Sequence, residues 1–387
     1  MIKHPPTSEI NKQIFSFFDS FKPMFSHAQW ENFVIFILGF LHDSRHKKVT
    51  DITELTDNLK DHSVLSKFLG SRSFSIFHIK EKMRHMFMKI YDKSKPVFLY
   101  IDDTLIEKAG DKVRADWNYS ASKSGFLFSN CIVVALIKNG NIELPFDFKK
   151  YFQERYEGDK EYRSKLDLCL MIIRRAVSCF GKEIYVLFDS WYAAAKVINK
   201  LKKDGIKFIT RLKSNRVILP VKMKLKEYAK TISPRKFKEV RIGDKSYFVY
   251  SEKLFINKIG EMHILFCKKK RYGKNVIFLC TNSELSDEKI LEEYIHRWEI
   301  EQFFSDTKEY LAFEDYQEIR QTSVSRHITV LFSAYFLVSV IRSVIEKCSG
   351  FVLTIGQTLK KIRKGISEVK LTLLRRLYQR KLEVKRC

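Results

Sequence analysis

The chain has 387 residues, enough for two or three domains built around a large core. Its apolar fraction of 45% and its 32 Phe exclude a disordered chain. Its net charge of +26, from 71 Lys and Arg against 45 Asp and Glu, favours nucleic acid or another anionic surface as partner, with a generally lysine-rich proteome as the alternative. The seven cysteines show no CxxC spacing, so we expect free thiols rather than disulfides or a zinc site.

The N-terminal region, residues 1–92, is expected to be helical. Its first residues contain no apolar signal core, which predicts a cytoplasmic protein. Apolar residues recur at helical spacing in IFSFFDSF and WENFVIFILGFL, and Gly and Pro are rare. This region is either a small DNA-binding module or a helical brace on the main domain.

Short apolar segments that end in acids follow this region. PVFLYIDDT (96–104) and IYVLFDS (184–190) are typical of buried strands. Between them, the segments 130–137 and 142–148 flank an Asn-Gly turn and predict a hairpin, and 161–180 has helical periodicity. This order of elements indicates a mixed α/β sheet with helices on its faces.

The second half of the chain changes character twice. A helix and a strand, 207–213, lead into a β-rich stretch that alternates clearly in KSYFVYSEKLFI. Helices resume near residue 286, and the apolar run 328–341 is shorter than a bilayer span, so we expect a buried helix that covers the sheet rather than a membrane segment. The end of the chain is strongly basic.

Acidic residues stand at the ends of two predicted strands and on the late helix. Asp102 and Asp103 close the first strand, Asp189 closes another, and Glu301 lies on the helix. Buried carboxylates need cations or metal, and oxygen ligands suit Mg²⁺ or Mn²⁺. Two such ions can activate a nucleophile and stabilise the leaving oxygen in phosphoryl transfer. The alternative is that each acid is a turn or helix-capping residue.

The stretch YIHRWEIEQFFSDTK (294–308) places four polar side chains on one helix stripe. Tyr294, Arg297, Glu301 and Lys308 are spaced at about 100° per residue along a common face. A guanidinium and an ammonium beside a carboxylate can hold a phosphodiester against metal. Two other acids of the stretch fall off this stripe and are expected to be solvated: Glu299 and Asp306.

This spacing of Tyr, Arg, Glu and Lys resembles the signature of the IS4-type DDE transposases, and the related IS701 group looks similar. IDDT resembles the first acidic motif of that family, VLFDSWY the second, and LAFEDYQ the continuation of the late helix. The resemblance covers roughly residues 96–345. It implies an RNase H-like fold with a β-rich insertion, and the cut-and-paste transposition of a bacterial insertion sequence.

By this resemblance, Asp102, Asp189 and Glu301 form the catalytic, metal-binding triad, with two Mg²⁺ or Mn²⁺ ions. Asp103 is the alternative to Asp102, because neighbours on a strand point to opposite faces and only one can be the ligand. We favour Asp102.

The residues expected to contact DNA are basic or aromatic and lie near these acids. Trp298 is either a platform for a displaced base or a core residue, and the basic strand end of TRLKSNR is either a DNA contact or a solvated loop. His296 is expected to be structural. The expected contacts are Tyr294, Arg297, Lys308, Trp298, Arg211 and Lys213.

The sequence therefore predicts a DDE transposase that cleaves and joins DNA at insertion-sequence ends. Its expected partners are terminal inverted repeats, target DNA and a second copy of itself, in the bacterial cytoplasm near the nucleoid. A nuclease with the same fold that does not join strands, and an inactive domesticated DNA-binding protein, are the alternatives. The predicted regions are a helical N-terminal region (1–92), the first part of the catalytic domain (93–215), a β-rich insertion (216–283), the remainder of the catalytic domain (284–345) and a basic helical tail (346–387).

Overall fold

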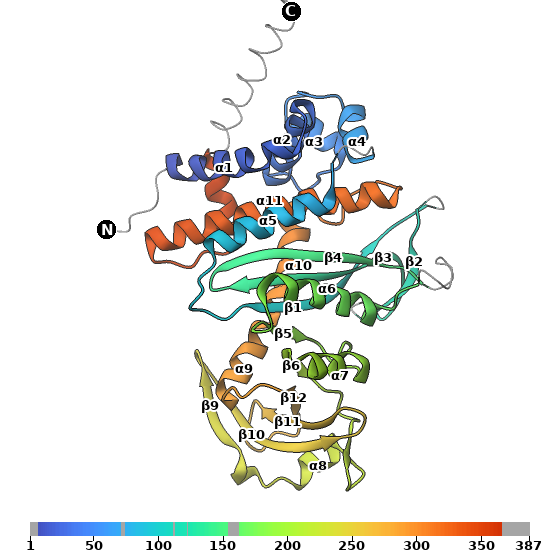
Figure 1. Ribbon diagram of the computed structural model, residues 1–387, viewed down its shortest axis with the longest axis vertical. Coiled ribbons are helices and arrows are strands. Elements are labelled where there is room, and N and C mark those ends of the chain that lie inside the picture. The colour runs from blue at the N-terminus through green and yellow to red at the C-terminus, as the bar shows by residue number, and fades with distance from the viewer. Residues whose placement is uncertain (1–6, 71–73, 111–112, 122, 154–161, 366–387) are drawn as a thin grey trace, which may run out of the picture.

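The structure is a computed structural model that describes residues 7–70, 74–110, 113–121, 123–153 and 162–365. Figure 1 shows helices at one end of the molecule, a sheet across its middle and a β-rich part at the other end. The predicted basic tail is described only as far as residue 365. The prediction of a mixed α/β, RNase H-like fold with a helical N-terminal region is confirmed.

The N-terminal helices share one hydrophobic core with the long helix α11 (Gln321–Ser349). The Phe17 and Phe336 rings lie 6.4 Å apart, and Phe40 meets His327 edge-on at 5.2 Å. This packing favours the brace over an independent module. The elements are α1 (Thr7–Phe21), η1 (Lys22–Met24), α2 (His27–Leu41), α3 (Val49–Leu55), α4 (His62–Gly70) and α5 (Ile76–Ile90).

The central sheet has the mixed directions expected of an RNase H-like domain. β3 pairs antiparallel with β1 and with β4, whereas β5 and β6 run parallel to β1. The short strand β2, which the sequence pattern did not indicate, pairs with the free end of β3. The strands are β1 (Phe98–Glu107), β2 (Asp116–Ser120), β3 (Gly125–Asn139), β4 (Ile142–Tyr151), β5 (Tyr185–Phe188) and β6 (Lys207–Arg211).

Helices cover both faces of this sheet (Figure 1). α6 packs on β1, β3 and β4, while α10 packs on β1 and α11 packs on β4. α6 begins where the Ser164 hydroxyl accepts a hydrogen bond from the Asp167 amide, and it ends at Gly181, whose φ of 77° suits glycine. These helices are α6 (Lys165–Phe180), α7 (Ala195–Asp204), α9 (Asp287–His296) and α10 (Trp298–Leu311).

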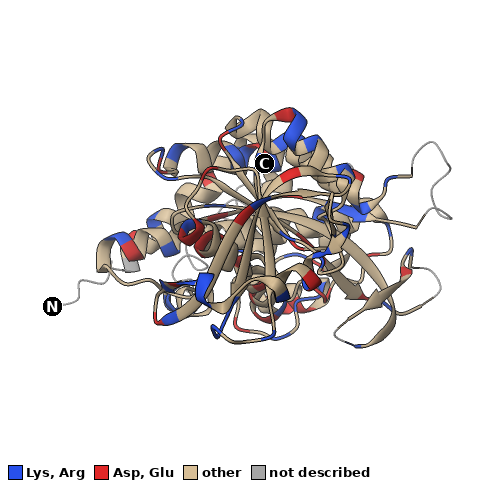
Figure 2. Cartoon of the chain, turned by 90° about the horizontal axis from the view of Figure 1, so that it is seen from below, with Lys and Arg blue, Asp and Glu red and all other residues tan. Residues whose placement is uncertain are grey.

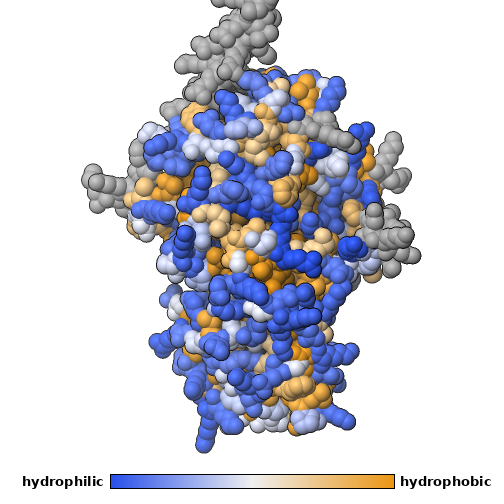
Figure 3. Space-filling view, viewed as in Figure 1, coloured by the Kyte–Doolittle hydropathy of each residue, from blue (hydrophilic) through white to orange (hydrophobic). Residues whose placement is uncertain are grey.

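The β-rich insertion continues the same sheet. β12 pairs antiparallel with β6, and β11, β10 and β7 follow in order, so the described residues form one sheet of twelve strands. The insertion contains β7 (Val217–Leu219), β8 (Met223–Lys224), α8 (Leu225–Thr231), η3 (Pro234–Lys236), β9 (Lys238–Ile242), β10 (Lys245–Ile256), β11 (Gly260–Lys268) and β12 (Ile277–Thr281). In the view of Figure 3, both ends of the molecule carry a largely hydrophilic surface with scattered apolar patches.

Helix α11 is long and apolar enough to cross a membrane, but 83% of its most apolar window is buried inside the protein. A core helix that is apolar all round has this composition. Its hydroxyl and aromatic groups meet β4: the Ser339 hydroxyl accepts a hydrogen bond from the Glu143 amide at 2.8 Å, and the Phe148 and Phe332 rings lie 5.5 Å apart. The prediction that this helix covers the sheet is confirmed.

The distribution of charged residues and the state of the cysteines can be compared with what composition indicated. Figure 2 shows Lys and Arg on many elements around the outline rather than on a single face. Net charge therefore does not locate a DNA site by itself. The six cysteines within the described residues are all free, and most are buried, in line with the absence of a disulfide pattern.

Candidate active site

Two predicted acids become neighbours because one strand ends early. β5 pairs with β1 up to Phe188, which lies opposite Ile101, and β1 continues to Glu107. Asp102 and Asp189 directly follow this last pair, which brings them close enough for the charge of Asp189 to act on Asp102. One carboxylate oxygen of Asp189 accepts hydrogen bonds from the Trp191 and Tyr192 amides at 2.9 and 3.3 Å.

Arg297 connects the first strand to the late helix. Its Nη1 lies 3.3 Å from Oδ2 of Asp102, and its Nη2 pairs with Oε1 of Glu301. The predicted single helix is wrong here: α9 ends at His296, Arg297 is the junction, and α10 begins at Trp298. The break allows the Arg297 guanidinium to lie between two carboxylates from different elements.

Burial makes Asp102 the electrostatically unusual acid of the group. Burial, then the charge of Asp189, then that of Asp103, raise the pKa of its carboxyl from 3.8 to about 7, against the opposing effect of Arg297. Arg297 therefore does not offset the combined effect of burial and the two neighbouring aspartates on Asp102. A further cation would lower the free energy of this cluster.

Asp103 points to the opposite face of β1 and is fully engaged there. Its Oδ2 accepts from Nζ of Lys165 at 2.7 Å and from the thiol of Cys131 at 3.4 Å, and its Oδ1 accepts from the Tyr192 hydroxyl at 2.8 Å. Lys165 begins α6, and Tyr192 lies in the turn after β5. Asp103 thus ties β1 to the turn that carries Asp189.

The carboxylates fit a divalent cation by their chemistry but are not arranged as a finished cage. Asp102, Asp189 and Glu301 would supply the oxygen donors that Mg²⁺ and Mn²⁺ prefer. Among the described residues, no three His, Cys, Asp or Glu side chains already lie close enough to hold a metal ion. Arg297 pairs with two of the three acids, so a cation bound there would share or displace it.

The sequence of this region matches a known family. The profile described as "Transposase DDE domain" matches residues 93–337. The chain belongs to this family. The protein "Probable transposase for insertion sequence element IS701" of Microchaete diplosiphon is 22% identical over 224 residues, which cover 56% of this chain and 58% of that relative. These findings agree with the resemblance to the IS4 and IS701 transposases, and the chain spans under two thirds of this relative's length.

The other predicted DNA contacts of this transposase-family chain lie at different distances from the acids. The β5–β6 register places Arg211 beside Asp189, and Arg211 and Arg297 both act electrostatically on Tyr294, whose pKa burial raises. Lys213 is exposed just beyond the end of β6. Lys308 lies two helical turns beyond Glu301 and pairs with Glu314 at 2.7 Å, away from the acids.

Trp298 is 64% exposed, so it does not pack α10 onto the sheet as a core residue would. Two other acids of α10, Glu299 and Asp306, were expected to be solvated. This prediction is wrong, because neither is freely solvated. Glu299 pairs with Lys138 and His296; burial alone would raise its pKa, but these partners lower it to about 2. Asp306 is 6% exposed and accepts from the Gln302 amide at 3.0 Å, and burial raises its pKa to about 6.

Three residues that support the acids were missed in the sequence. Lys165 and Tyr192 hold Asp103, and Trp191, which is 46% exposed, stands directly beside Asp189 with the Lys165 ammonium 5.2 Å from its ring. The only sequence signal was the Trp-Tyr pair after VLFDS. Lys165 carries no local signal, because it meets Asp103 only through the packing of α6 on the sheet.

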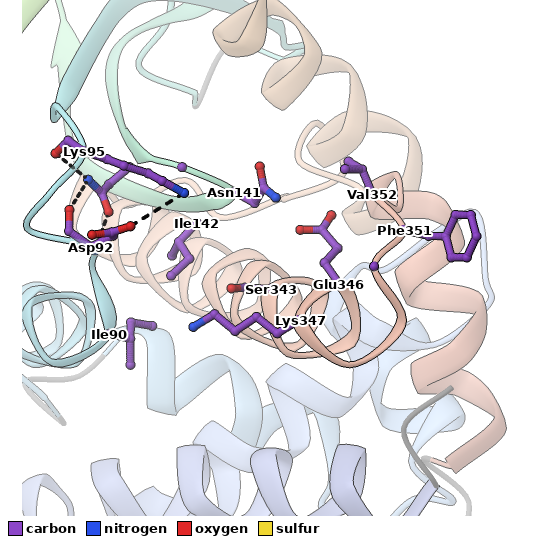
Figure 4. Close-up of a pocket in the computed structure, with 13 residues that line it drawn as sticks. Ile90, Asp92, Lys95, Asn141, Ile142, Ser343, Glu346, Lys347, Phe351 and Val352 are labelled. Atoms are coloured by element: carbon purple, nitrogen blue, oxygen red, sulfur yellow. Dashed lines mark hydrogen bonds and ion pairs between the residues drawn. The ribbon is translucent and has the colours of Figure 1, made fainter. Parts of the chain in front are cut away.

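A separate hollow lies between the β3–β4 turn and the end of α11 (Figure 4). Its polar groups are used to hold the chain together: the Asn139 amide donates to the carbonyls of Asp92, Lys95 and Pro96 at 3.0 to 3.2 Å. None of the predicted acids is among its described lining residues. This hollow is not a candidate for the chemistry.

Proposed function

We propose that this chain cleaves DNA at the ends of an insertion sequence and joins the freed ends to target DNA. The observation that supports this most directly is that Arg297 joins Asp102 of β1 to Glu301 of α10, while the charge of Asp189, after β5, acts on Asp102. Within a family of transposases, such acids at the edge of the sheet are suited to phosphodiester chemistry.

We assign the ligand role to Asp102 rather than Asp103. Asp102 faces α10 and the other two acids, whereas both carboxylate oxygens of Asp103 already have partners on the other face. Bound there, Mg²⁺ or Mn²⁺, in two copies, would activate the attacking oxygen and neutralise the charge of the leaving one. Asp103 would keep Asp102 and Asp189 at a fixed separation.

The proposed reaction has two steps of the same kind. Water attacks the phosphorus at the transposon end and breaks its bond to the 3′ oxygen, which leaves a 3′ hydroxyl and a 5′ phosphate. The freed 3′ hydroxyl then attacks a phosphodiester of the opposite strand or of target DNA, and another 3′ oxygen departs. The chain's contribution is to align the attacking and leaving oxygens and to stabilise charge.

The basic residues around the acids are proposed to hold the DNA backbone. In this proposal Arg297 and Arg211 flank the scissile bond, and Arg297 exchanges a carboxylate partner for a phosphate. Lys308 and Lys213 contact phosphates farther away. The exposed ring of Trp298 is proposed to stack on a displaced base.

The proposed partners are terminal inverted repeats, target DNA and a second copy of the chain that holds the other end. The proposed setting is the bacterial cytoplasm, at the nucleoid. The N-terminal helices are proposed to brace the sheet, since they share its core with α11.

A labelled end fragment tests the proposal. The full chain is incubated with Mg²⁺, a duplex that carries the element's terminal repeat and an unlabelled target, and the products are separated on a denaturing gel. We expect cleaved and joined products from wild type and neither from Asp189→Ala or Glu301→Ala. Cleavage without joined product would indicate a nuclease, no cleavage by wild type an inactive copy, and full cleavage by either variant would overturn the assigned site.

A further inference from the structure

The hairpin of β2 and β3 exposes aromatic side chains and buries polar ones. Four aromatic side chains, which we call the aromatic platform, occupy one of its faces: Trp117 and Tyr119 from β2, and Phe126 and Phe128 from β3. Trp117, Tyr119 and Phe126 are 56%, 63% and 69% exposed, and Phe128 is half-buried. Figure 1 shows β2 and the adjoining end of β3 at the side of the molecule, beyond the helices that cover the sheet.

The opposite face of the hairpin carries its polar residues and is buried. Asp116, Asn118, Ser120 and Ser129 are each at most 8% exposed. The Asn118 amide donates to the carbonyls of Asp116 and Ser129 at 3.1 Å and to the Ser129 hydroxyl at 3.2 Å. The Asp116 carboxylate also accepts from the Gln153 amide at 3.0 Å, and the Gln153 side chain donates to the carbonyl of Trp117 at 3.0 Å, so the hairpin is held in this orientation against the chain that follows β4.

This arrangement opposes the hydrophobic effect and indicates that the aromatic face has a ligand. Apolar surface in water is unfavourable, and a contiguous exposed aromatic patch usually marks a binding surface. The four rings also form two packed pairs. Trp117 lies 5.7 Å from Phe128, and Tyr119 lies 5.8 Å from Phe126 in an edge-on pair.

Strand register places the aromatic platform on the same face of the sheet as Asp102. Val134 of β3 pairs with Asp102, and alternate residues from 134 back to 126 share a face. Phe128 and Phe126 are six and eight residues from Val134. At about 3.3 Å per residue, the platform begins roughly 20 to 26 Å from the carboxylates along one strand.

Two lysines lie between the carboxylates and the platform on this face. Lys308 of α10 pairs with Glu314, and the carbonyl of Glu314 accepts from Lys108, 3.2 Å away. The Lys108 amide in turn donates to the carbonyl of Phe128 at 2.9 Å. The two ammonium groups are thus linked through Glu314, and the backbone of Lys108 is bonded to that of Phe128 in the aromatic platform.

We infer that the aromatic platform binds unpaired bases of the DNA strand whose backbone lies at the carboxylates, an inference that rests on the proposed function. Successive side chains on one face of a strand are about 6.6 Å apart, close to twice the 3.4 Å rise of stacked bases. One base therefore fits between the rings of Trp117 and Tyr119. Stacking of this kind is independent of base identity.

A second copy of this chain is the other conceivable occupant. The platform's position favours DNA, because it lies in line with the acids and with Lys308, on the face that the substrate must reach. The four side chains of the platform are uncharged, so they do not themselves repel a phosphate backbone.

The test measures binding without cleavage. A fluorescein-labelled 12-nucleotide oligothymidylate is titrated with the full chain in EDTA, and its anisotropy is recorded. Replacing two rings, Trp117→Ala with Tyr119→Ala, is expected to weaken binding about 10- to 100-fold, the scale of one to two lost stacking contacts. The variant Trp117→Phe with Tyr119→Phe is expected to retain most of the affinity.

Matched controls separate stacking from other effects. Tyr272→Ala removes a ring that is 78% exposed but lies in the β-rich insertion, and it is expected to change nothing. A blunt duplex of 12 base pairs is expected to bind the alanine variant as well as wild type. Undiminished oligothymidylate binding, or an equal loss on the duplex, would overturn the inference.

Sedimentation velocity addresses the rival occupant. Self-association of wild type that the alanine variant abolishes, with unchanged oligothymidylate affinity, would assign the platform to a second copy and overturn the inference. The proposed function fails separately: Asp189→Ala that still cleaves would overturn the catalytic assignment and leave this binding measurement standing, since EDTA prevents cleavage throughout.

Discussion

The adjacent aspartates on the two faces of β1 have different surroundings. Asp102 faces α10, where burial and two acidic neighbours raise its pKa to about 7 and Arg297 is its cationic partner. Asp103 faces α6, where Lys165, Tyr192 and Cys131 all donate to it. The strand fixes their spacing, but their surroundings differ: Asp102 is buried near the charges of Asp189 and Asp103, whereas Asp103 accepts from three donors.

This difference separates two ways in which a carboxylate serves a site. An acid with unmet charge is available to a cation, whereas an acid with every oxygen engaged holds the surrounding chain in place. Adjacent positions of the same residue type can therefore be assigned different roles, and substitutions at each should differ in kind.

The largest expected effect is on cleavage. Asp102→Asn removes the charge with little change of shape, and the cleavage rate in Mg²⁺ should fall about 1000-fold, the upper scale for losing one charge-stabilising group. Asp103→Asn keeps an acceptor for Tyr192 and should cost about 10-fold. Single-turnover rates on the labelled end fragment measure both, and a greater loss from Asp103→Asn would reverse the two roles.

The next largest effect is a loss of stability from substitution of Asp103, on the α6 face. Asp103→Ala leaves the largely buried ammonium of Lys165 and the hydroxyl of Tyr192 without their acceptor, which should lower the free energy of unfolding by about 2–4 kcal/mol. The control is Glu107→Ala on the same strand. It removes an exposed ion pair with Lys123 and should lower the free energy of unfolding by under about 1 kcal/mol. Equal losses in urea unfolding would show that Asp103 is not a structural tie.

Asp102 should also make stability depend on pH in the absence of divalent metal. Because the folded pKa of about 7 exceeds the ordinary value of 3.8, the folded state holds a proton between roughly pH 4 and 7 that the unfolded state has released. Stability should therefore fall as pH rises through this window, and Asp102→Asn should reduce the fall by about 3 kcal/mol. Guanidinium unfolding in EDTA at pH 4.5 and 7.5 tests this, and identical slopes for both proteins would refute it.

The smallest effect should come from the exposed ring on the α10 face. Trp298→Ala should change the free energy of unfolding by less than about 0.5 kcal/mol, since the side chain is 64% exposed. Trp30→Ala is the matched control: that ring is 8% exposed and its N–H donates to Phe18, so its loss should cost about 3 kcal/mol or more. Strong destabilisation by Trp298→Ala would make it a packing residue.

Much of the sheet could be predicted from the sequence because its strands have a strong local pattern. The apolar segments that end at Asp102 and Asp189 are strands as expected, and the Asn-Gly turn does join a hairpin. The choice between Asp102 and Asp103 was open in the sequence, because alternation separates the two faces but does not say which helix covers each.

Other features depended on contacts between distant residues. No Gly or Pro marks the break at Arg297, whose backbone remains in the right-handed helical region at φ −54° and ψ −25°. Asp306 is buried by helices that approach from elsewhere in the chain. β2 was missed because its alternation is inverted, with aromatic residues outward and polar residues inward.

Metal binding distinguishes Asp102 from Asp103 as the ligand. Titrating Mn²⁺ into wild type, Asp102→Asn and Asp103→Asn by calorimetry, with circular dichroism to confirm the fold, compares the two faces of β1 without DNA or catalysis. We expect Asp102→Asn to lose Mn²⁺ binding and Asp103→Asn to retain it. Retained binding in Asp102→Asn together with loss in Asp103→Asn would instead make Asp103 the ligand.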